Sequence, residues 1–96
     1  MTSTTHSFPA ALKAVRKARG LSQEAFSDVS SRTYLSWLER GLKSPTLSKV
    51  NDLCEAMDVH PLTLLTLAYG DNDKARDKLF ERVRRELAEI QSSQAE

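Results

Sequence analysis

The chain is poor in the residues that interrupt helices and in the patterns that build strands. Its 96 residues include only three glycines and three prolines, and β-branched residues form no extended run. Apolar residues instead recur at intervals of three and four. We therefore expect an all-α protein, and the length suits one domain with a small core.

Cysteine and long apolar runs are also scarce. The one cysteine, Cys54, has no second cysteine in the chain to pair with. No segment approaches the roughly 18 apolar residues of a membrane span, and residues 1–20 lack the apolar run of a signal peptide. These absences predict a cytoplasmic protein with no membrane partner. Cys54 falls on the apolar stripe of its helix and is expected in the core, with redox sensing as the alternative.

Catalytic patterns are missing as well. The sequence has no Ser/His/Asp arrangement, no glycine-rich phosphate loop and no metal-ligand spacing, and its two histidines lie far apart, at positions 6 and 60. An enzyme is therefore the poorest fit, and we expect neither a metal nor a cofactor.

Charge is divided unevenly along the chain. Residues 1–49 hold eight Lys/Arg against three acids, which gives +5, and residues 50–96 hold six against ten, which gives −4. Two readings stay open from charge alone: each half has an ordinary solvated surface, or the first half faces a polyanion.

Capping residues and apolar spacing divide the chain into helices. The first is predicted from Pro9 to Arg19 with Gly20 as its stop, the second from the N-cap Ser22 to Asp28. The others are expected from Ser31 to Arg40 with Gly41 as the stop, from the N-cap Thr46 to about 57, from Pro61 to about 70, and within 71–96. Inward positions are assigned to these side chains: Leu12, Val15, Ala25, Phe26, Val29, Leu35, Leu38, Leu47, Val50, Leu53, Met57, Leu62 and Leu65, with Leu64 as a further candidate.

Three segments follow from this division: a flexible arm at 1–8, a helical domain at 9–70 and an amphipathic helix at 71–96. The last carries apolar residues at heptad spacing, which makes it a candidate for dimerisation. The candidates are Leu79, Phe80, Val83, Leu87 and Ile90. A helix packed on its own domain and a frayed tail are the alternatives.

The stretch SRTYLSWLERG at 31–41 is polar and basic on its outward side, apart from Trp37. A short helix before it and a tight turn give the outline of a helix-turn-helix. The segments LSQEAF, SRTYLSWLERG, SPTLSKVNDLCEAM and VHPLTLL, in this order, resemble the Cro/C1-type (XRE family) helix-turn-helix over about residues 9–67. The resemblance implies a five-helix lambda-repressor-like domain that binds double-stranded DNA, here with an additional C-terminal helix.

The resemblance also implies roles for individual residues. Positions that face base edges are matched by Arg32, Thr33, Ser36 and Trp37. Candidates for phosphate contacts are Ser22, Gln23, Tyr34, Arg40, Lys43 and Ser44. Glu39, on the inward flank of its helix, is expected to form a partly buried ion pair with Arg16. Glu39 follows Gln23 by 16 positions, about two fewer than in the family pattern. We therefore expect a tighter turn between Phe26 and Ser31, which would change the angle between the two helices.

Three hypotheses for Trp37 stay open. Its indole could pack on thymine methyls or a sugar edge of the DNA, pack against neighbouring parts of its own chain, or contact a dimer mate or partner protein. For the whole chain we expect a sequence-specific transcription regulator, a repressor bound as a homodimer to an inverted repeat. The alternative is an antitoxin-like autoregulator that also binds a partner protein through its C-terminal half.

Overall fold

The structure, a computed structural model, describes residues 7–94, and within that range it is built of helices without a strand. The elements in chain order are α1 (Phe8–Ala18), η2 (Gln23–Phe26), α2 (Arg32–Glu39), α3 (Leu47–Met57), α4 (Pro61–Tyr69) and α5 (Asp73–Gln94). The predicted all-α class is confirmed. The flexible arm predicted at 1–8 lies outside the described residues up to His6. It is wrong for the last two residues, because Phe8 opens α1 and the amide of Ser7 donates to the Ala68 carbonyl at 2.9 Å.

Residues at the helix ends explain where the helices begin and stop. The side chains of Ser31 and Thr46 accept backbone N–H bonds at the N-termini of α2 and α3, as N-caps do. Gly20 and Gly41 follow α1 and α2 with φ of +72° and +75°, in the left-handed region that glycine enters most easily. Each glycine thus ends its helix in the manner that the sequence predicted.

The core lies where α1 packs against α2 and α4. Its fully buried side chains are Leu12, Phe26, Leu35, Leu38, Leu53, Cys54, Met57 and Leu64. Two predicted inward leucines are wrong, because Leu47 is 70% exposed and Leu62 is 64% exposed. Leu47 is the first residue of α3 and precedes the segment that packs on the core. In α4 the buried positions are Leu64 and Ala68, on the side that meets α1, so Leu62 points away.

The second predicted helix is wrong in type and length. The segment from Gln23 to Phe26 forms a single 3₁₀ turn, and the side chain of Ser22 makes no capping hydrogen bond. The amides of Val29 and Ser30 both donate to the Phe26 carbonyl, at 2.9 and 2.8 Å, so the chain turns at once toward α2. Phe26 is buried and anchors this turn, whereas Ala25, predicted to face inward, is exposed. The short spacing is thus absorbed by reducing the second helix to one turn.

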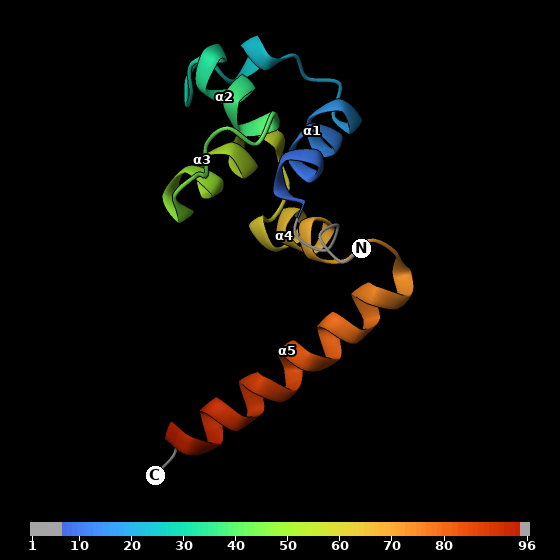
Figure 1. Cartoon of the computed structure of the whole chain (residues 1–96). Helices are drawn as coiled ribbons and strands as arrows, with labels where there is room; N and C mark the ends of the chain where they lie inside the picture. The colour runs from blue at the N-terminus through green and yellow to red at the C-terminus, as the bar shows by residue number, and fades with distance from the viewer. Residues whose placement is uncertain (1–6, 95–96) are drawn as a thin grey trace.

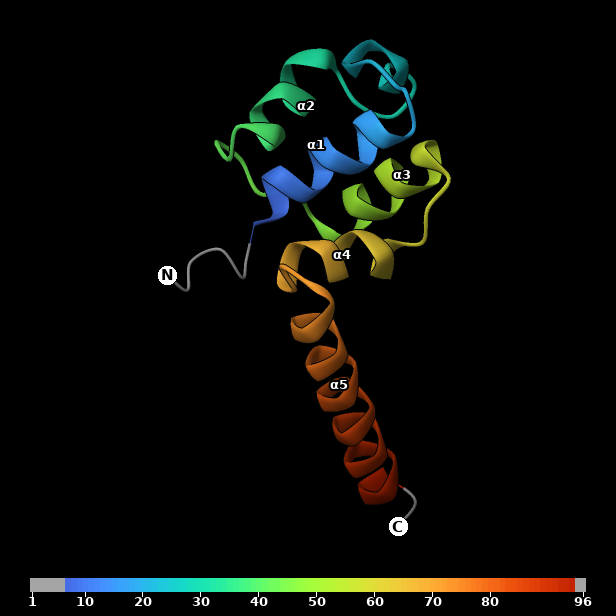
Figure 2. The same cartoon turned by 90° about the vertical axis from the view of Figure 1, so that its right-hand side faces the viewer.

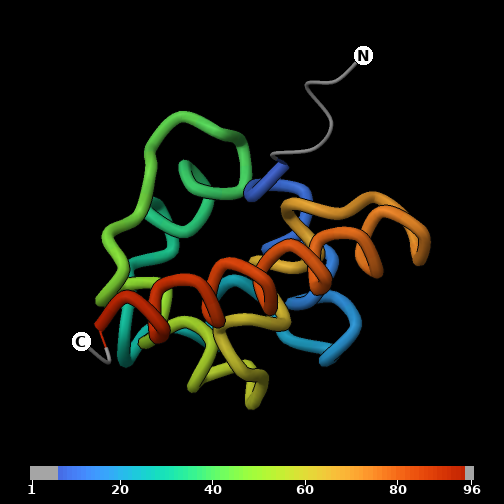
Figure 3. The backbone as a smooth tube through the Cα atoms, turned by 90° about the horizontal axis from the view of Figure 1, so that it is seen from below, coloured from blue at the N-terminus to red at the C-terminus, as the bar shows by residue number. Residues whose placement is uncertain are grey.

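The C-terminal helix α5 extends away from the rest of the molecule (Figures 1 and 2). It contains 22 residues, none of them buried, and spans about 33 Å at 1.5 Å per residue. In both views α2 lies at the end of the globular part opposite to α5, and from below α5 crosses under that part (Figure 3). Of the three expectations for residues 71–96, a helix packed along its own domain is wrong beyond the first turns, which contact α4. Within residues 7–94 no helix has both the length and the apolar character of a membrane span.

The junction between α4 and α5 is tightly bonded. The carbonyl of Gly70 accepts a hydrogen bond from Nε of Arg76 at 3.1 Å, and the Asn72 side chain accepts the Ala75 amide at 2.9 Å. Nη1 of Arg76 also pairs with Asp73 at 3.2 Å. A Cβ on Gly70 would stand 2.8 Å from Cγ of Arg76, so the arginine fits only over a glycine. These contacts fix the direction in which α5 leaves the domain.

Candidate nucleic-acid interface

Helix α2 packs on the core through one side, and its other side faces the solvent. Leu35 and Leu38 are fully buried beneath it, and the hydroxyl of Ser31 accepts the Tyr34 amide at 3.0 Å. Arg32, exposed to solvent, begins the helix on its outward side. The helix is therefore anchored by apolar residues and leaves a polar face free for a ligand.

That outward face forms one wall of a shallow concavity. The residues that line it are Gln23, Arg32, Thr33, Ser36 and Arg40. Three of the four predicted base-facing residues thus share one surface with two of the predicted phosphate contacts. Their side chains are small or basic, which suits an approach to a polyanion.

Arg32 has an ion-pair partner on the preceding 3₁₀ turn. Its Nη1 lies 3.2 Å from the Glu24 carboxylate, and the two side chains are 67% and 71% exposed. An exposed pair of this kind contributes little stability and exchanges readily with solvent. Glu24 therefore steadies Arg32 at the surface without preventing it from binding elsewhere. Glu24 was not predicted as a partner of Arg32, although the two residues lie eight positions apart across the turn.

Arg16 and Glu39 form a bidentate pair inside the domain. Nε and Nη2 of Arg16 donate to the Glu39 carboxylate at 2.6 and 3.0 Å, and the side chains are only 10% and 4% exposed. Nη1 of Arg16 donates to the Leu21 carbonyl at 2.8 Å. The predicted pair thus joins α1 to the C-terminal end of α2.

The side chain of Gln23 extends this network to the surface. Its Nε2 donates to Oε1 of Glu39 at 3.1 Å, while the residue also lines the concavity. One amide proton is engaged by Glu39, so the second proton and the amide oxygen are the groups left for a ligand. Gln23 therefore lies at the surface predicted to bind DNA, and its hydrogen bond to the buried Glu39 sets the orientation of its amide group.

The pKa values reflect the strength of this pairing. Burial alone raises the pKa of Glu39, but the hydrogen bonds from Arg16 and Gln23, with the charges of Arg16 and Lys13, outweigh it and leave the pKa below its ordinary value. The hydrogen bond to Glu39 raises the pKa of Arg16. Both groups are therefore charged at neutral pH.

Trp37 does not line the concavity and is half-buried. Nζ of Lys43 lies over its ring, 5.4 Å from the centroid. The loop reaches this position because the chain reverses at Gly41, where the Leu42 amide donates to the Trp37 carbonyl at 2.8 Å. The indole is thus in contact with the predicted phosphate-binding Lys43.

The remaining predicted contacts lie around this face. Ser22 and Ser44 are exposed, while Tyr34 is half-buried and packs against the core. Nζ of Lys49 lies 5.8 Å from the Tyr34 ring centroid and donates to the Val29 carbonyl at 2.5 Å. Lys49 was not among the predicted site residues, because its contact with Tyr34 depends on how α2 and α3 pack in the fold.

Two short consecutive helical segments, the second with an exposed polar face, define a helix-turn-helix protein. Residues 12–64 match the helix-turn-helix family profile of the Cro/C1 type, which is more than half of the chain. The chain therefore belongs to the Cro/C1-type (XRE) helix-turn-helix family. The family indicates a DNA-binding transcription regulator and not an enzyme.

A solved structure agrees with this assignment. The crystal structure of the restriction-modification controller protein C.AhdI from Aeromonas hydrophila is similar, with a TM-score of 0.58 and 31% sequence identity. The match covers 97% of that chain and 65% of this one, so about a third of this chain has no counterpart there. The family match also ends before α5 begins. No curated protein sequence matches the chain.

Proposed function

We propose that the protein is a repressor that binds an inverted-repeat operator as a homodimer, with α2 in the major groove. The observation that carries this proposal is the concavity in which Arg32, Thr33, Ser36 and Arg40 meet on the outward side of α2. A helix enters the major groove when its outward side chains are short or can bond to base edges. The similar controller protein supports a regulator of this kind, and we propose that it acts in the cytoplasm.

Arg32 is the proposed principal base reader. It is exposed at the first position of α2, where the end of a recognition helix approaches the bases. Its guanidinium can donate two bonds to O6 and N7 of guanine. To bind a base, Arg32 must leave the Glu24 carboxylate. This costs little free energy because the pair is exposed to solvent.

Thr33 and Ser36 supply the neighbouring contacts. The threonine offers a hydroxyl to a base or a methyl group to thymine, and the serine is short enough to let the helix lie deep. Arg40, Lys43 and Ser44 then face the phosphates, with Ser22, Gln23 and Tyr34 as further contacts. Phosphate contacts fix the register of the protein but carry no sequence information.

For Trp37 we propose a supporting role. Its ring lies under Lys43, and a cation over an aromatic face is held by electrostatic attraction. The indole therefore orients Lys43 toward the DNA backbone. This favours contact with neighbouring protein over direct contact with a thymine methyl.

Homodimerisation is assigned to the apolar stripe of α5. Phe80, Val83, Leu87 and Ile90 are 43–56% exposed, and Leu79 is half-buried beside them. To bind an inverted repeat, such a dimer must set its two α2 helices about one DNA turn apart.

Selection of bound fragments from a random DNA library tests the function. We expect a two-fold symmetric consensus, and Arg32→Ala should weaken binding by about 1–3 kcal/mol and relax preference at one base position of each half-site. Thr46→Ala serves as a control, since Thr46 caps α3 outside the concavity. Binding with no consensus at any salt concentration would contradict the proposal, and an equal loss on all sequences would make Arg32 a phosphate contact.

A further inference from the structure

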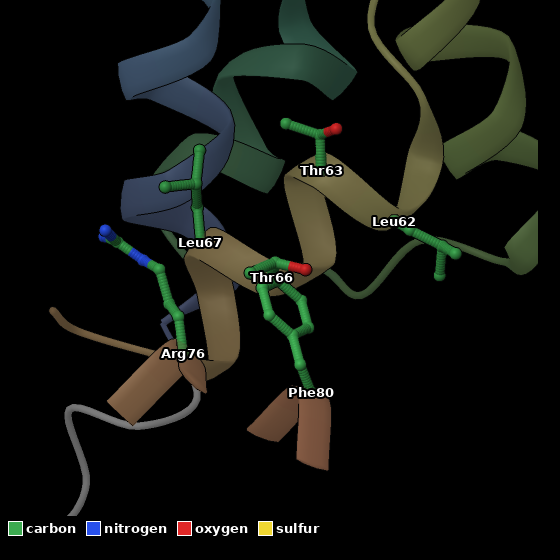
Figure 4. A pocket seen from close by; sticks show the side chains of 6 residues that line it. All are labelled: Leu62, Thr63, Thr66, Leu67, Arg76 and Phe80. Carbon is green, nitrogen blue, oxygen red and sulfur yellow. The ribbon is translucent and has the colours of Figure 1, made fainter. Parts of the chain in front are cut away.

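A cleft between α4 and α5 is lined almost entirely by apolar side chains. From α4 it takes Leu62, Leu65 and Tyr69, and from α5 it takes Leu79, Phe80 and Val83. Figure 4 shows a neighbouring hollow that shares Leu62, Thr66 and Phe80 with the cleft; Phe80 points toward Thr66, and Leu62 stands apart from them. The cleft therefore has two walls from one chain.

The exposed apolar surface of the described chain is concentrated on the two helices that form this cleft. Of the eight large hydrophobic side chains that are exposed, six lie on α4 and α5, and only Leu42 and Leu47 lie elsewhere. The stripe continues beyond the cleft through Val83, Arg84 and Leu87, which line a second hollow with Phe80. A contiguous apolar patch on a small protein marks an interaction surface.

The apolar stripe on α5 suits packing against another helix, and the cleft, about 200 Å³ in volume, can take side chains of that helix. Apolar residues on α5 follow steps of three, four and three from Phe80 to Ile90, the spacing by which one helix packs against another. The wall contributed by α4 runs at a distinct angle to α5 (Figure 2). A helix lying across the cleft would contact both walls through a single apolar stripe.

The occupant that fits is a second copy of α5. It carries an unpartnered apolar stripe of the required spacing, and a two-fold dimer presents one such helix for each cleft. Residues 73–94 hold six basic and five acidic side chains, so two copies meet without a large net repulsion. The same near-neutrality makes the cleft a poor site for nucleic acid, unlike the basic first half of the chain.

We infer that the cleft between α4 and α5 receives α5 of a second protomer, reciprocally. This rests on the proposed homodimer and adds the α4 side chains Leu62, Leu65 and Tyr69 to its interface. Since the α4–α5 junction is fixed by the bonds of Gly70 and Arg76, insertion of α5 also fixes one DNA-binding domain relative to the other.

The test compares three leucine-to-glutamine variants of the full chain by sedimentation equilibrium. Leu62→Gln alters the α4 wall and Leu87→Gln alters the stripe on α5, whereas Leu47→Gln is the matched control. All three leucines are helical and 53–70% exposed, so each variant is expected to fold, which circular dichroism verifies. Each substitution is present twice in a symmetric dimer.

We expect Leu62→Gln and Leu87→Gln each to raise the dimer dissociation constant at least about tenfold, and Leu47→Gln to leave it within about twofold. If Leu87→Gln disrupts the dimer while Leu62→Gln behaves like the control, the inference is overturned but the homodimer through α5 stands. A wild-type chain that stays monomeric, or that pairs only with a different protein, overturns the inference. DNA selection on the same samples then decides the proposed function separately.

Discussion

Removing one partner of the buried pair between Arg16 and Glu39 should destabilise the domain far more than removing both. Glu39→Gln leaves the guanidinium of Arg16, 10% exposed, without its counter-ion. Arg16→Met leaves a carboxylate at 4% exposure with only Gln23 as a donor. Breaking a buried pair in this way costs about 3–5 kcal/mol, since an uncompensated charge stays in the interior.

The double variant restores electrical balance. Its two neutral side chains impose no unpaired charge, so we expect its loss of stability to be smaller than either single loss, which requires a coupling of more than about 3 kcal/mol. That coupling is large beside the roughly 5–15 kcal/mol of total stability of a small domain. If a single variant is largely unfolded while the double variant is folded, the coupling between the two residues is larger still.

Urea unfolding followed by circular dichroism measures the cycle, with unchanged slopes confirming comparable unfolding transitions. The control is the exposed pair of Arg32 and Glu24 in the same protein, treated identically as Arg32→Met and Glu24→Gln. Its coupling should stay below about 1 kcal/mol, because both side chains are solvated. The reasoning is refuted if the two cycles give the same coupling.

Further predictions follow from neighbouring features. Because the pKa of Glu39 is lowered in the folded state, its stabilisation is complete above the unfolded value of about 4.3 and is lost as the pH falls through the folded value. The stability difference between wild type and Glu39→Gln should therefore shrink in acid, and a difference independent of pH would contradict the assignment. Gly70→Ala should cost about 1–3 kcal/mol, as its Cβ meets Cγ of Arg76 at 2.8 Å, and in an Arg76→Ala background the cost should fall. A cycle between Trp37→Leu and Lys43→Gln should show about 0.5–1 kcal/mol of coupling in DNA affinity, equal on all sequences; a changed base preference would make Trp37 a base contact.

Helix ends were predictable because their signals are local. Gly20 and Gly41 supply backbone conformations that other residues adopt at a cost, and Ser31 and Thr46 supply a side-chain acceptor to the next turn. The partnership of Arg16 with Glu39 also came from local reasoning combined with the family resemblance. None of these predictions needed knowledge of the packing between helices.

The orientation of α4 was not predictable in the same way. Six of the nine residues from Pro61 to Tyr69 are Leu, Ala or Tyr, so a helical wheel shows no polar side to mark the surface. Packing against α1 selects Leu64 and Ala68 for burial and leaves Leu62 outside. The 3₁₀ turn at Gln23–Phe26 escaped prediction for a different reason, since four residues are too few to display a period.

The shortened second helix and the buried ion pair are physically related. With η2 reduced to one turn, Phe26 is the only fully buried side chain that this segment contributes, which is a small apolar anchor for the start of α2. The network of Arg16, Glu39 and Gln23 crosses the same gap, joining α1, η2 and the far end of α2. Polar contacts of fixed geometry thus hold the C-terminal end of α2, while the apolar anchor at its start is small. An ionic network specifies orientation more narrowly than apolar contact does, because it tolerates little displacement before its hydrogen bonds are lost. The angle of α2, and with it the direction of Arg32, therefore depends on Glu39 as much as on the turn.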